Sequence, residues 1–155
     1  MAGGADRFLA RAAERGLDLE VATFPEGTRT AQDAARAIGC EVAAIVKSLV
    51  FIADDTPVLV LTSGANRVDE ARLAATLDAE VVRKADAGEV REATGYAIGG
   101  TPPFGLDRRI RVLYDNDLLR FDRVWAAAGT PTQVFGIAPD TLIATSGAEV
   151  ATVTG

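Results

Sequence analysis

Histidine is absent from this 155-residue chain, and cysteine occurs once, at Cys40. Without histidine, neither a Ser-His-Asp triad nor a Cys-His pair can form, and no metal can be bound through imidazole. A single cysteine excludes an internal disulfide and cannot build a zinc or iron–sulfur centre. Counting alone leaves an oxygen-only magnesium or calcium site open, but the sequence has no loop of the EF-hand type. We therefore expect no metal and no cofactor.

Long apolar runs are lacking as well. The longest, such as residues 45–53, are far shorter than the roughly 20 residues that a membrane helix needs. Residues 1–6 show no basic segment followed by an apolar core, so no signal peptide is expected. Hydrophobic residues make up 48% and charged residues 25% of the chain, which is ordinary for a globular protein. We expect one cytoplasmic domain over residues 1–155, with no membrane partner.

Positive charge is scarce, since the formal net charge is −6 and the pI is about 4.7. Proteins that hold nucleic acid mainly through phosphates usually carry a basic surface. The composition therefore argues against general nucleic-acid binding and against a DNA partner, but not against recognition of one RNA end. Only Lys47 and Lys84 are lysines, against fourteen arginines. With so strong a bias toward arginine, a lysine that remains suggests a chemical requirement for an ammonium group.

Apolar spacing and capping residues predict the order of the elements. Helices are expected at 6–15, 31–38, from 66 or 69 to 77, 86–94 and from 139 onward. Strands are expected at 19–24, 45–53, 58–62, 80–83, 110–114, 124–127, 133–137 and 149–153. Because these elements do not alternate as regular βαβ units, the predicted class is mixed α/β, with a mixed, largely antiparallel sheet covered by helices.

The first candidate for chemistry is Lys47, within the apolar strand predicted at 45–53. Strand alternation places Lys47 on one face with Leu49 and Phe51. An ammonium on an apolar face either reaches water at the strand edge or lies at the mouth of a cleft, where it meets a phosphate or a developing negative charge. A phosphate-binding P-loop is excluded, because valines at 42 and 46 stand where that motif needs glycines.

The second candidate is the loop 95–105, which contains four glycines and two adjacent prolines. Glycines allow sharp bends and close backbone approach, whereas prolines stiffen the chain. The loop is therefore either a structural turn or a frame that aims several amides at one anion, as in an oxyanion hole. Pro102 and Pro103 have no amide hydrogen. The amides that can donate are those of Gly100, Thr101, Phe104 and Gly105.

Three further features have plainer interpretations. Asp115 follows a predicted strand and is typical of a turn or a helix start. The aromatic residues Trp125 and Phe135 fit a hydrophobic core better than a platform for stacking bases. The cluster Arg108, Arg109 and Arg111 fits a solvated surface better than a phosphate site.

Taken together, these motifs resemble the YbaK/EbsC-like family, which includes the editing domain of bacterial prolyl-tRNA synthetases and its free-standing relatives. The resemblance covers about residues 25 to 145. The matching residues are Thr30, Ala34, Ala35 and Gly39, then 45–51, 58–61, Ser63, Gly64, Thr94 to Tyr96, Gly99, Gly100, Pro103, Phe104, Gly105 and Asp115.

The resemblance implies a YbaK-like fold with a barrel-like sheet, and a single aminoacyl-tRNA editing domain. The implied activity is hydrolysis of the ester of a mischarged tRNA, most simply tRNA-Pro, in trans to prolyl-tRNA synthetase and without a metal. The implied catalytic residues are Lys47, Gly99, Gly100 and Thr101. The implied substrate-binding residues, which would receive the acceptor end of aminoacyl-tRNA, are Thr30, Ser48, Gly64, Pro103, Phe104, Gly105 and Asp115. Because such an ester is already activated, positioning, an oxyanion site and a water can suffice.

Two positions depart from the family pattern. Some members carry a histidine late in the chain, near the acyl pocket, whereas residues 129–132 here are Gly-Thr-Pro-Thr. Pro102 also removes an amide that other members offer before the second proline. A non-catalytic module of the same fold, which binds an aminoacyl or nucleotide-like ligand, is therefore the alternative to the enzyme.

Overall fold

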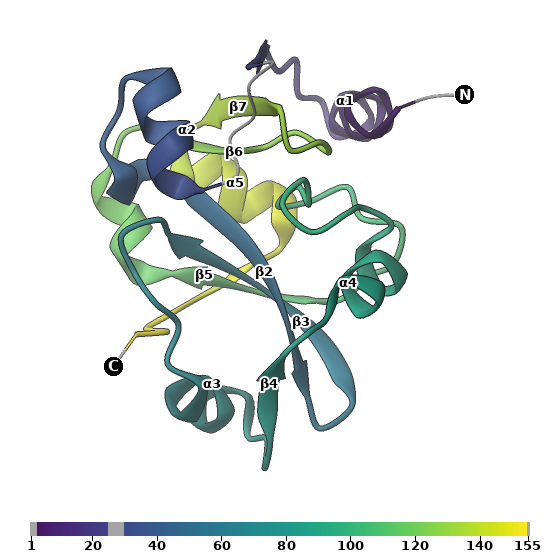
Figure 1. Cartoon of the computed structure of the whole chain (residues 1–155), viewed down its shortest axis with the longest axis vertical. Helices are drawn as coiled ribbons and strands as arrows, with labels where there is room; N and C mark the ends of the chain where they lie inside the picture. Colours follow the sequence, from purple (N-terminus) through teal and green to yellow (C-terminus); the bar gives the residue numbers. More distant parts are fainter. Residues whose placement is uncertain (1–2, 25–29, 155) are drawn as a thin grey trace.

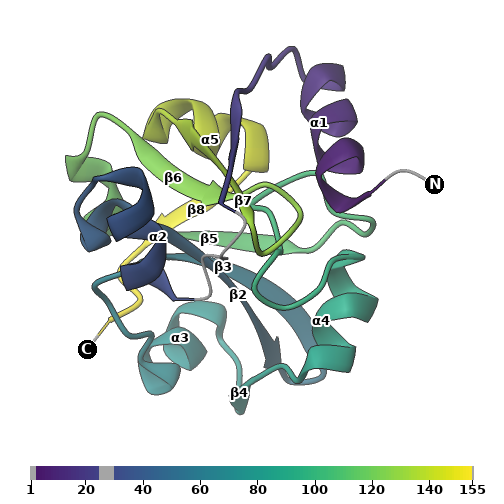
Figure 2. The same ribbon diagram turned by 45° about the horizontal axis from the view of Figure 1, so that its top comes forward.

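Two β-sheets and five α-helices make up the part of the computed structural model that is described, residues 3–24 and 30–154 (Figures 1 and 2). The helices are α1 (Gly4–Glu14), α2 (Ala31–Ile38), α3 (Glu70–Leu77), α4 (Ala87–Thr94) and α5 (Pro139–Ser146). The strands are β1 (Val21–Thr23), β2 (Val46–Ala53), β3 (Thr56–Ser63), β4 (Val82–Lys84), β5 (Arg111–Asp115), β6 (Val124–Ala127), β7 (Gln133–Ile137) and β8 (Glu149–Ala151). Two short 3-10 helices are η1 (Val42–Ala44) and η2 (Asn116–Arg120). The predicted mixed α/β class is confirmed.

The sheets do not close into a barrel, so that detail of the expectation was wrong. The larger sheet has the order β4-β2-β3-β5-β8 and the smaller one the order β1-β7-β6. Within the described chain they are joined by a single parallel bridge between Ile45 and Trp125. The edge strands β4 and β8 have three residues each, and short edge strands offer little unpaired main chain for further pairing. The pairing is largely antiparallel, as expected, but β5 runs parallel to both β3 and β8.

The central hairpin of β2 and β3 fixes the register around Lys47. Asp54 and Asp55 form its turn with φ values of 45° and 70°, and positive φ at both central residues is the requirement of a type I′ turn. Pairing then continues along both strands and sets Lys47 opposite Thr62. On its other side, β2 pairs with β4 only from Phe51 onward. The half of β2 that carries Lys47 therefore has an open edge there.

Strand alternation divides the core into two layers. Val50 and Leu61 point to one face of the large sheet, which is covered by α1, α4, α5 and the small sheet. Phe51 and Val60 point to the other face, where Leu73 of α3 packs on them. Figure 2 shows α3 on the opposite side of β2 and β3 from α1 and α5. The first layer is the larger one. The candidate site lies at the open edge of β2, where Val50 of the first layer and Lys47 and Leu49, which alternate to the other face, all line it.

Capping residues explain where the helices begin. Thr30 caps α2 by accepting a hydrogen bond from the Asp33 amide at 3.0 Å, and Gly39 ends that helix with a φ of 86°. Asp69, one of the two residues predicted to open the next helix, is the N-cap of α3. The observed strands β1, β4 and β8 are shorter than, or shifted from, the strands predicted at 19–24, 80–83 and 149–153. No helix in the described residues is long and apolar enough to cross a membrane.

Candidate functional site

A cavity of about 500 Å³ opens beside the free edge of β2. Its walls come from β2, the start of α2, the turn at residues 98–101, and the strands β6 and β7. Six of the predicted site residues line it, namely Thr30, Lys47, Ser48, Gly64, Gly99 and Thr101. The structure therefore brings together residues from four separate segments. Its volume suits a small organic ligand or the end of a larger one.

Lys47 lies in this wall half-buried, and its ammonium Nζ donates a 2.6 Å hydrogen bond to the main-chain oxygen of Asn66. Burial lowers the pKa of Lys47, and the nearby cations Lys84 and Arg67 lower it further, whereas Asp115 opposes the shift. No carboxylate of the described chain forms an ion pair with Lys47. Its positive charge is therefore oriented by a neutral partner but not neutralised.

Ser48 and Gly64 shape the same wall in different ways. The Ser48 hydroxyl oxygen is buried and has no hydrogen-bond partner among the described residues. Gly64 is packed so closely that an added Cβ would lie 2.5 Å from the Val42 oxygen and 2.8 Å from the Ala31 Cβ. Its amide donates to the Ile45 oxygen at 2.7 Å. Gly64 thus holds the end of β3 against the start of α2.

The first residues of α2 form a second polar element of the cavity. Thr30, Ala31 and Gln32 line it, and they include the N-cap and the first helical turn. Helix starts carry partial positive charge from amides that have no partner within the helix. The start of α2 and the Lys47 ammonium therefore present positive potential to the same space, which favours an anionic ligand.

The first half of the glycine-rich loop forms a tight turn. The Gly100 amide donates to the Ala97 oxygen at 3.0 Å, and Gly99 takes a φ of 86° that glycine adopts readily. The sequence interpretation counted Gly100 among the amides free to bind an anion, and the structure shows that this amide is already engaged. Gly100 itself packs against Thr130, whose main-chain carbon would lie 2.9 Å from an added Cβ. The amides of Gly99 and Thr101 donate no hydrogen bond to any residue in the described ranges.

The second half of the loop turns into the core instead of the cavity. Phe104 packs in an aromatic cluster, with its ring centroid 4.9 Å from that of Phe8 and 6.0 Å from that of Phe135. The Gly105 oxygen accepts hydrogen bonds from the Tyr96 hydroxyl at 3.1 Å and from Arg11 at 2.7 Å. Pro103, Phe104 and Gly105 are buried and do not line the cavity. In this structure they anchor the loop.

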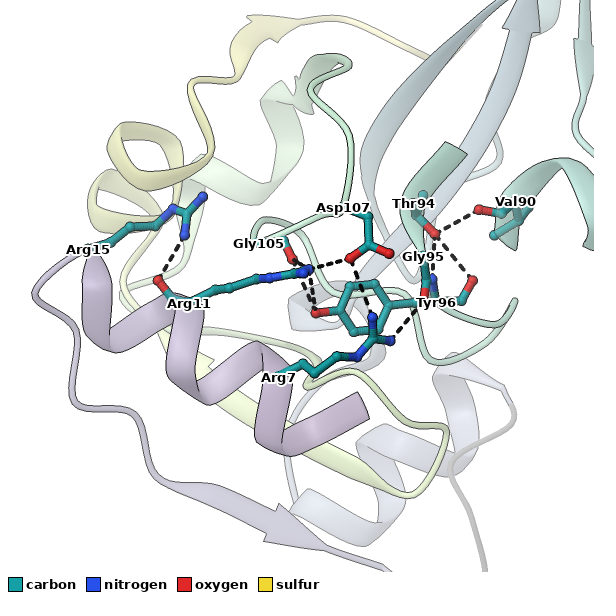
Figure 3. A network of polar contacts seen from close by, with 9 residues as sticks. All are labelled: Arg7, Arg11, Arg15, Val90, Thr94, Gly95, Tyr96, Gly105 and Asp107. Carbon is teal, nitrogen blue, oxygen red and sulfur yellow. Dashed lines mark hydrogen bonds and ion pairs between the residues drawn. The ribbon is translucent and has the colours of Figure 1, made fainter. Parts of the chain in front are cut away.

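Helix α1 fastens this loop through two arginines, as Figure 3 shows. Arg11 contacts Asp107 at 2.7 Å, and Arg7 donates to the Gly95 oxygen at 2.8 Å. The Arg7 guanidinium also lies 4.6 Å from the centre of the Tyr96 ring. Hydrogen bonding to Asp107 raises the pKa of Arg11. These contacts fix both ends of the loop, so the turn at Gly99 is held from outside the cavity.

Asp115 does not line the cavity and lies almost fully buried at the end of β5. Its carboxylate accepts hydrogen bonds from the Thr62 hydroxyl at 2.8 Å and from the Ser63 amide at 2.9 Å. It also accepts from the Asn66 side chain and the Asp117 amide, both at 2.9 Å. Burial by itself would raise the pKa of Asp115, but these hydrogen bonds outweigh burial and lower it. The capping interpretation fits, because Asp115 is also the N-cap of η2.

Sequence reasoning overlooked several residues of the cavity. Lys84 lines it from the end of β4, and the scarcity of lysine was the one signal that pointed to this residue. Trp125 was assigned to the core, yet it is only half-buried and forms part of the cavity wall, with Arg123 stacked 4.7 Å from its ring centre. Phe135 is in the core as expected. Arg111 pairs with Glu149 at 3.0 Å on an exposed surface.

Metal chemistry has no obvious ligand set in this site. Among the described residues, no group of three or more histidine, cysteine, aspartate or glutamate side chains is placed to hold a metal ion. The polar groups at the cavity are the ammonium groups of Lys47 and Lys84, hydroxyls, the Gln32 side chain and main-chain amides. Such groups bind anions and carbonyl oxygens.

Comparison with known proteins identifies relatives along most of the chain. The family model described as "Aminoacyl-tRNA editing domain" matches residues 25–145. The protein YwhH of Bacillus subtilis is 32% identical over 124 residues, which cover 79% of this chain and 78% of YwhH. The proline–tRNA ligase of Lactobacillus helveticus is 34% identical over 103 residues, 66% of this chain but only 18% of the ligase. The chain thus spans less than a fifth of the length of the ligases it matches.

Solved structures agree with this relationship. A crystal structure described as a candidate trans-editing enzyme for prolyl-tRNA synthetase has a TM-score of 0.93 and 42% sequence identity, over 100% of this chain and 99% of the other. The crystal structure of the hypothetical protein APE2540 has a TM-score of 0.87 and 30% identity, over 95% and 98% of the two chains. The resemblance to the YbaK-like fold is confirmed. By the extent of the family match, this chain belongs to the aminoacyl-tRNA editing domain family.

Proposed function

We propose that this chain removes a wrongly attached amino acid from tRNA, acting in trans to prolyl-tRNA synthetase on mischarged tRNA-Pro. The observation that carries the proposal is the cavity in which Lys47, the start of α2 and the turn at Gly99 and Thr101 converge. Membership of an editing-domain family supports the same role. The match of the whole chain to a candidate trans-editing enzyme supports action apart from a synthetase. The proposal implies a cytoplasmic protein.

Positive groups in the cavity fit the acceptor end of tRNA. The Lys47 ammonium has three hydrogens, of which one is donated to Asn66, so two remain for a phosphate or ribose oxygen. The first turn of α2 adds amides suited to the same anion. We infer that these groups hold the terminal nucleotide, with Thr30, Ser48 and Gly64 around it.

The turn then meets the ester. In hydrolysis, the oxygen of a water attacks the ester carbonyl carbon, the bond from that carbon to the ribose oxygen breaks, and the ribose oxygen takes up the proton that the water gives up. Negative charge develops on the carbonyl oxygen, and the amides of Gly99 and Thr101 are the donors available to stabilise it. No histidine is needed, because the ester is activated and a ribose hydroxyl of the terminal nucleotide can orient the water. We propose that the reaction needs no metal.

A binding module without catalysis is the second candidate. The engaged amide of Gly100 favours it, because the turn offers one donor fewer than the sequence indicated. The net charge of −6 also weakens general affinity for RNA. Such a module would bind the aminoacyl end of tRNA and leave the ester intact.

The test is a deacylation screen with tRNA-Pro charged in turn with alanine, cysteine, serine, threonine and proline. We expect one or more of the non-cognate esters to be hydrolysed faster than prolyl-tRNA. The Lys47→Ala variant should lose most of this activity, whereas Arg91→Ala, an exposed change on α4, should keep it. Binding of a charged tRNA with no hydrolysis of any would establish the module instead. Undiminished hydrolysis by Lys47→Ala would refute the assignment of this site.

A further inference from the structure

The partner that orients Lys47 is a loop carbonyl, and this loop is itself held from behind. Asn66 lies between the end of β3 and the start of α3, and its main-chain oxygen accepts the 2.6 Å hydrogen bond from Lys47. The main-chain amide of Asn66 donates a hydrogen bond to the main-chain oxygen of Ser63 at 2.9 Å, which bends the loop back toward β3. Where the Asn66 oxygen lies therefore decides where the ammonium points.

Two carboxylates fix the Asn66 side chain. Its Nδ2 donates to Asp115 at 2.9 Å and to Asp117 at 2.7 Å. A side-chain amide nitrogen has two hydrogens, so both are used. Hydrogen bonds to charged acceptors are stronger than those between neutral groups. The loop is thus tied to the end of β5 and the start of η2, two segments that do not touch the cavity.

Asp115 cannot shift without cost. Besides Asn66, it accepts hydrogen bonds from Thr62 and Ser63 on the neighbouring strand, where both residues are almost completely buried. Moving the carboxylate would leave these buried donors without partners. The parallel pairing of β3 and β5 holds the same groups together through the main chain. Asp115 is therefore a rigid reference point for the loop.

We propose that Asp115 and Asn66 are positioning residues that set the direction of the Lys47 ammonium for substrate, a role that rests on the function proposed above. The arrangement has a chemical advantage. A carboxylate bonded directly to Lys47 would neutralise the charge that the substrate needs. Here the carboxylate binds the Asn66 side chain, and the neutral main-chain carbonyl of Asn66 orients the ammonium. The attraction of Asp115 also offsets part of the lowering of the Lys47 pKa that burial causes.

A different explanation is that the Asp115 network only stabilises the fold around β3, β5 and η2. The two explanations differ in how Asn66 and Lys47 depend on each other. If Asn66 acts through Lys47, its removal matters only while Lys47 is present. If Asn66 only stabilises the fold, its removal costs the same with or without the lysine.

The experiment is a double-mutant cycle of Asn66→Ala and Lys47→Met, read as kcat/KM for deacylation and as the affinity for an uncharged acceptor-stem RNA hairpin ending in CCA. Asn66 is chosen because replacing Asp115 would strand buried donors. We expect Asn66→Ala to lower both quantities by roughly tenfold in the unaltered protein and by less than about twofold in the Lys47→Met background. The control Asp69→Ala removes the N-cap of α3 in the same loop and should lower the melting temperature with kcat/KM unchanged.

Additive effects of Asn66→Ala and Lys47→Met, or a loss of activity with Asp69→Ala as large as with Asn66→Ala, would overturn the positioning role. If no charged tRNA is hydrolysed but the effects of the two substitutions on RNA affinity are coupled, the positioning role stands and the hydrolase proposal fails. If hydrolysis is observed and the effects of the two substitutions are additive, the proposed function stands and the positioning role fails. If neither hydrolysis nor coupling is found, both proposals fail.

Discussion

Replacing Gly64 by alanine tests how tightly the cavity wall is built. The new methyl group would lie 2.5 Å from the Val42 oxygen, 2.8 Å from the Ala31 Cβ and 3.2 Å from the Ile45 Cβ. Two of these contacts are shorter than real Cβ atoms show. One is to the main chain of η1 and the other to the first residue of α2, so these segments must move away from Gly64. Overpacking of this kind costs about 1–3 kcal/mol, which for a chain of this size lowers the melting temperature by about 2–12 °C.

The displacement should also reach the chemistry, because Ala31 and Gly64 both line the cavity. We expect Gly64→Ala to lower kcat/KM for deacylation at a temperature where the variant is still folded, as checked by circular dichroism. Gly88→Ala is the matched control, since Gly88 lies within α4 and an added Cβ there comes no closer than 3.4 Å to Asp86. That variant should be more stable by about 0.5–1 kcal/mol. A Gly64→Ala protein with the melting temperature and activity of the unaltered chain would refute the close packing described here.

Three further predictions concern charged residues. Arg11→Met keeps the aliphatic packing but removes the hydrogen bonds to the loop. It should lower the free energy of unfolding by about 1–3 kcal/mol and speed amide hydrogen exchange in residues 95–107. Unchanged exchange would contradict the role of Arg11 in holding the loop. RNA affinity falls as the salt concentration rises, and Lys84→Met should make this fall less steep by about one phosphate contact. The control Arg36→Met should leave the slope unchanged. A Lys84→Met slope equal to that of the unaltered protein would exclude Lys84 from RNA contact. Hydrogen bonding to Arg83 lowers the pKa of Glu89 from 4.5 to about 2, so the contribution of Glu89 to stability is complete above about pH 4.5 and is lost as the pH falls toward 2. In acid titrations followed by circular dichroism, Glu89→Gln should make the stability depend less on pH in this window. An unchanged curve would contradict the pairing.

The elements that sequence reasoning predicted well are those with local causes. Thr30 and Gly39 bound α2 because capping depends on residues within one turn. The β2–β3 hairpin was predictable from two apolar runs around a short polar turn. Lys47 at a cavity could be suspected, since an ammonium on an apolar strand needs a polar surrounding.

The contacts that sequence reasoning did not predict join distant segments. Phe104 and Gly105 belong to the family motif, but their direction was decided by α1 and the aromatic cluster, which a loop sequence does not reveal. Asn66 seemed to be a candidate helix cap, and its actual partners lie 49 and 51 positions away. The division of the strands into two sheets also depends on distant segments, since β1 pairs with β7 and β5 with β8.

Within the part of the chain that the structure describes, one bridge joins the two sheets, and this bears on how the protein can evolve. In the cavity wall, Lys47 and Ser48 belong to the large sheet and Gly64 directly follows it, whereas Trp125, Ala126 and Val134 come from the small sheet. In the function proposed above, the terminal nucleotide binds beside Lys47, which would leave the small-sheet residues to contact the amino acid. Substitutions there would then change the space for the amino acid and leave Lys47 in place. On that proposal, selectivity for the amino acid and affinity for the tRNA end would be separable, and duplicated copies of one gene could diverge in the first while they keep the second.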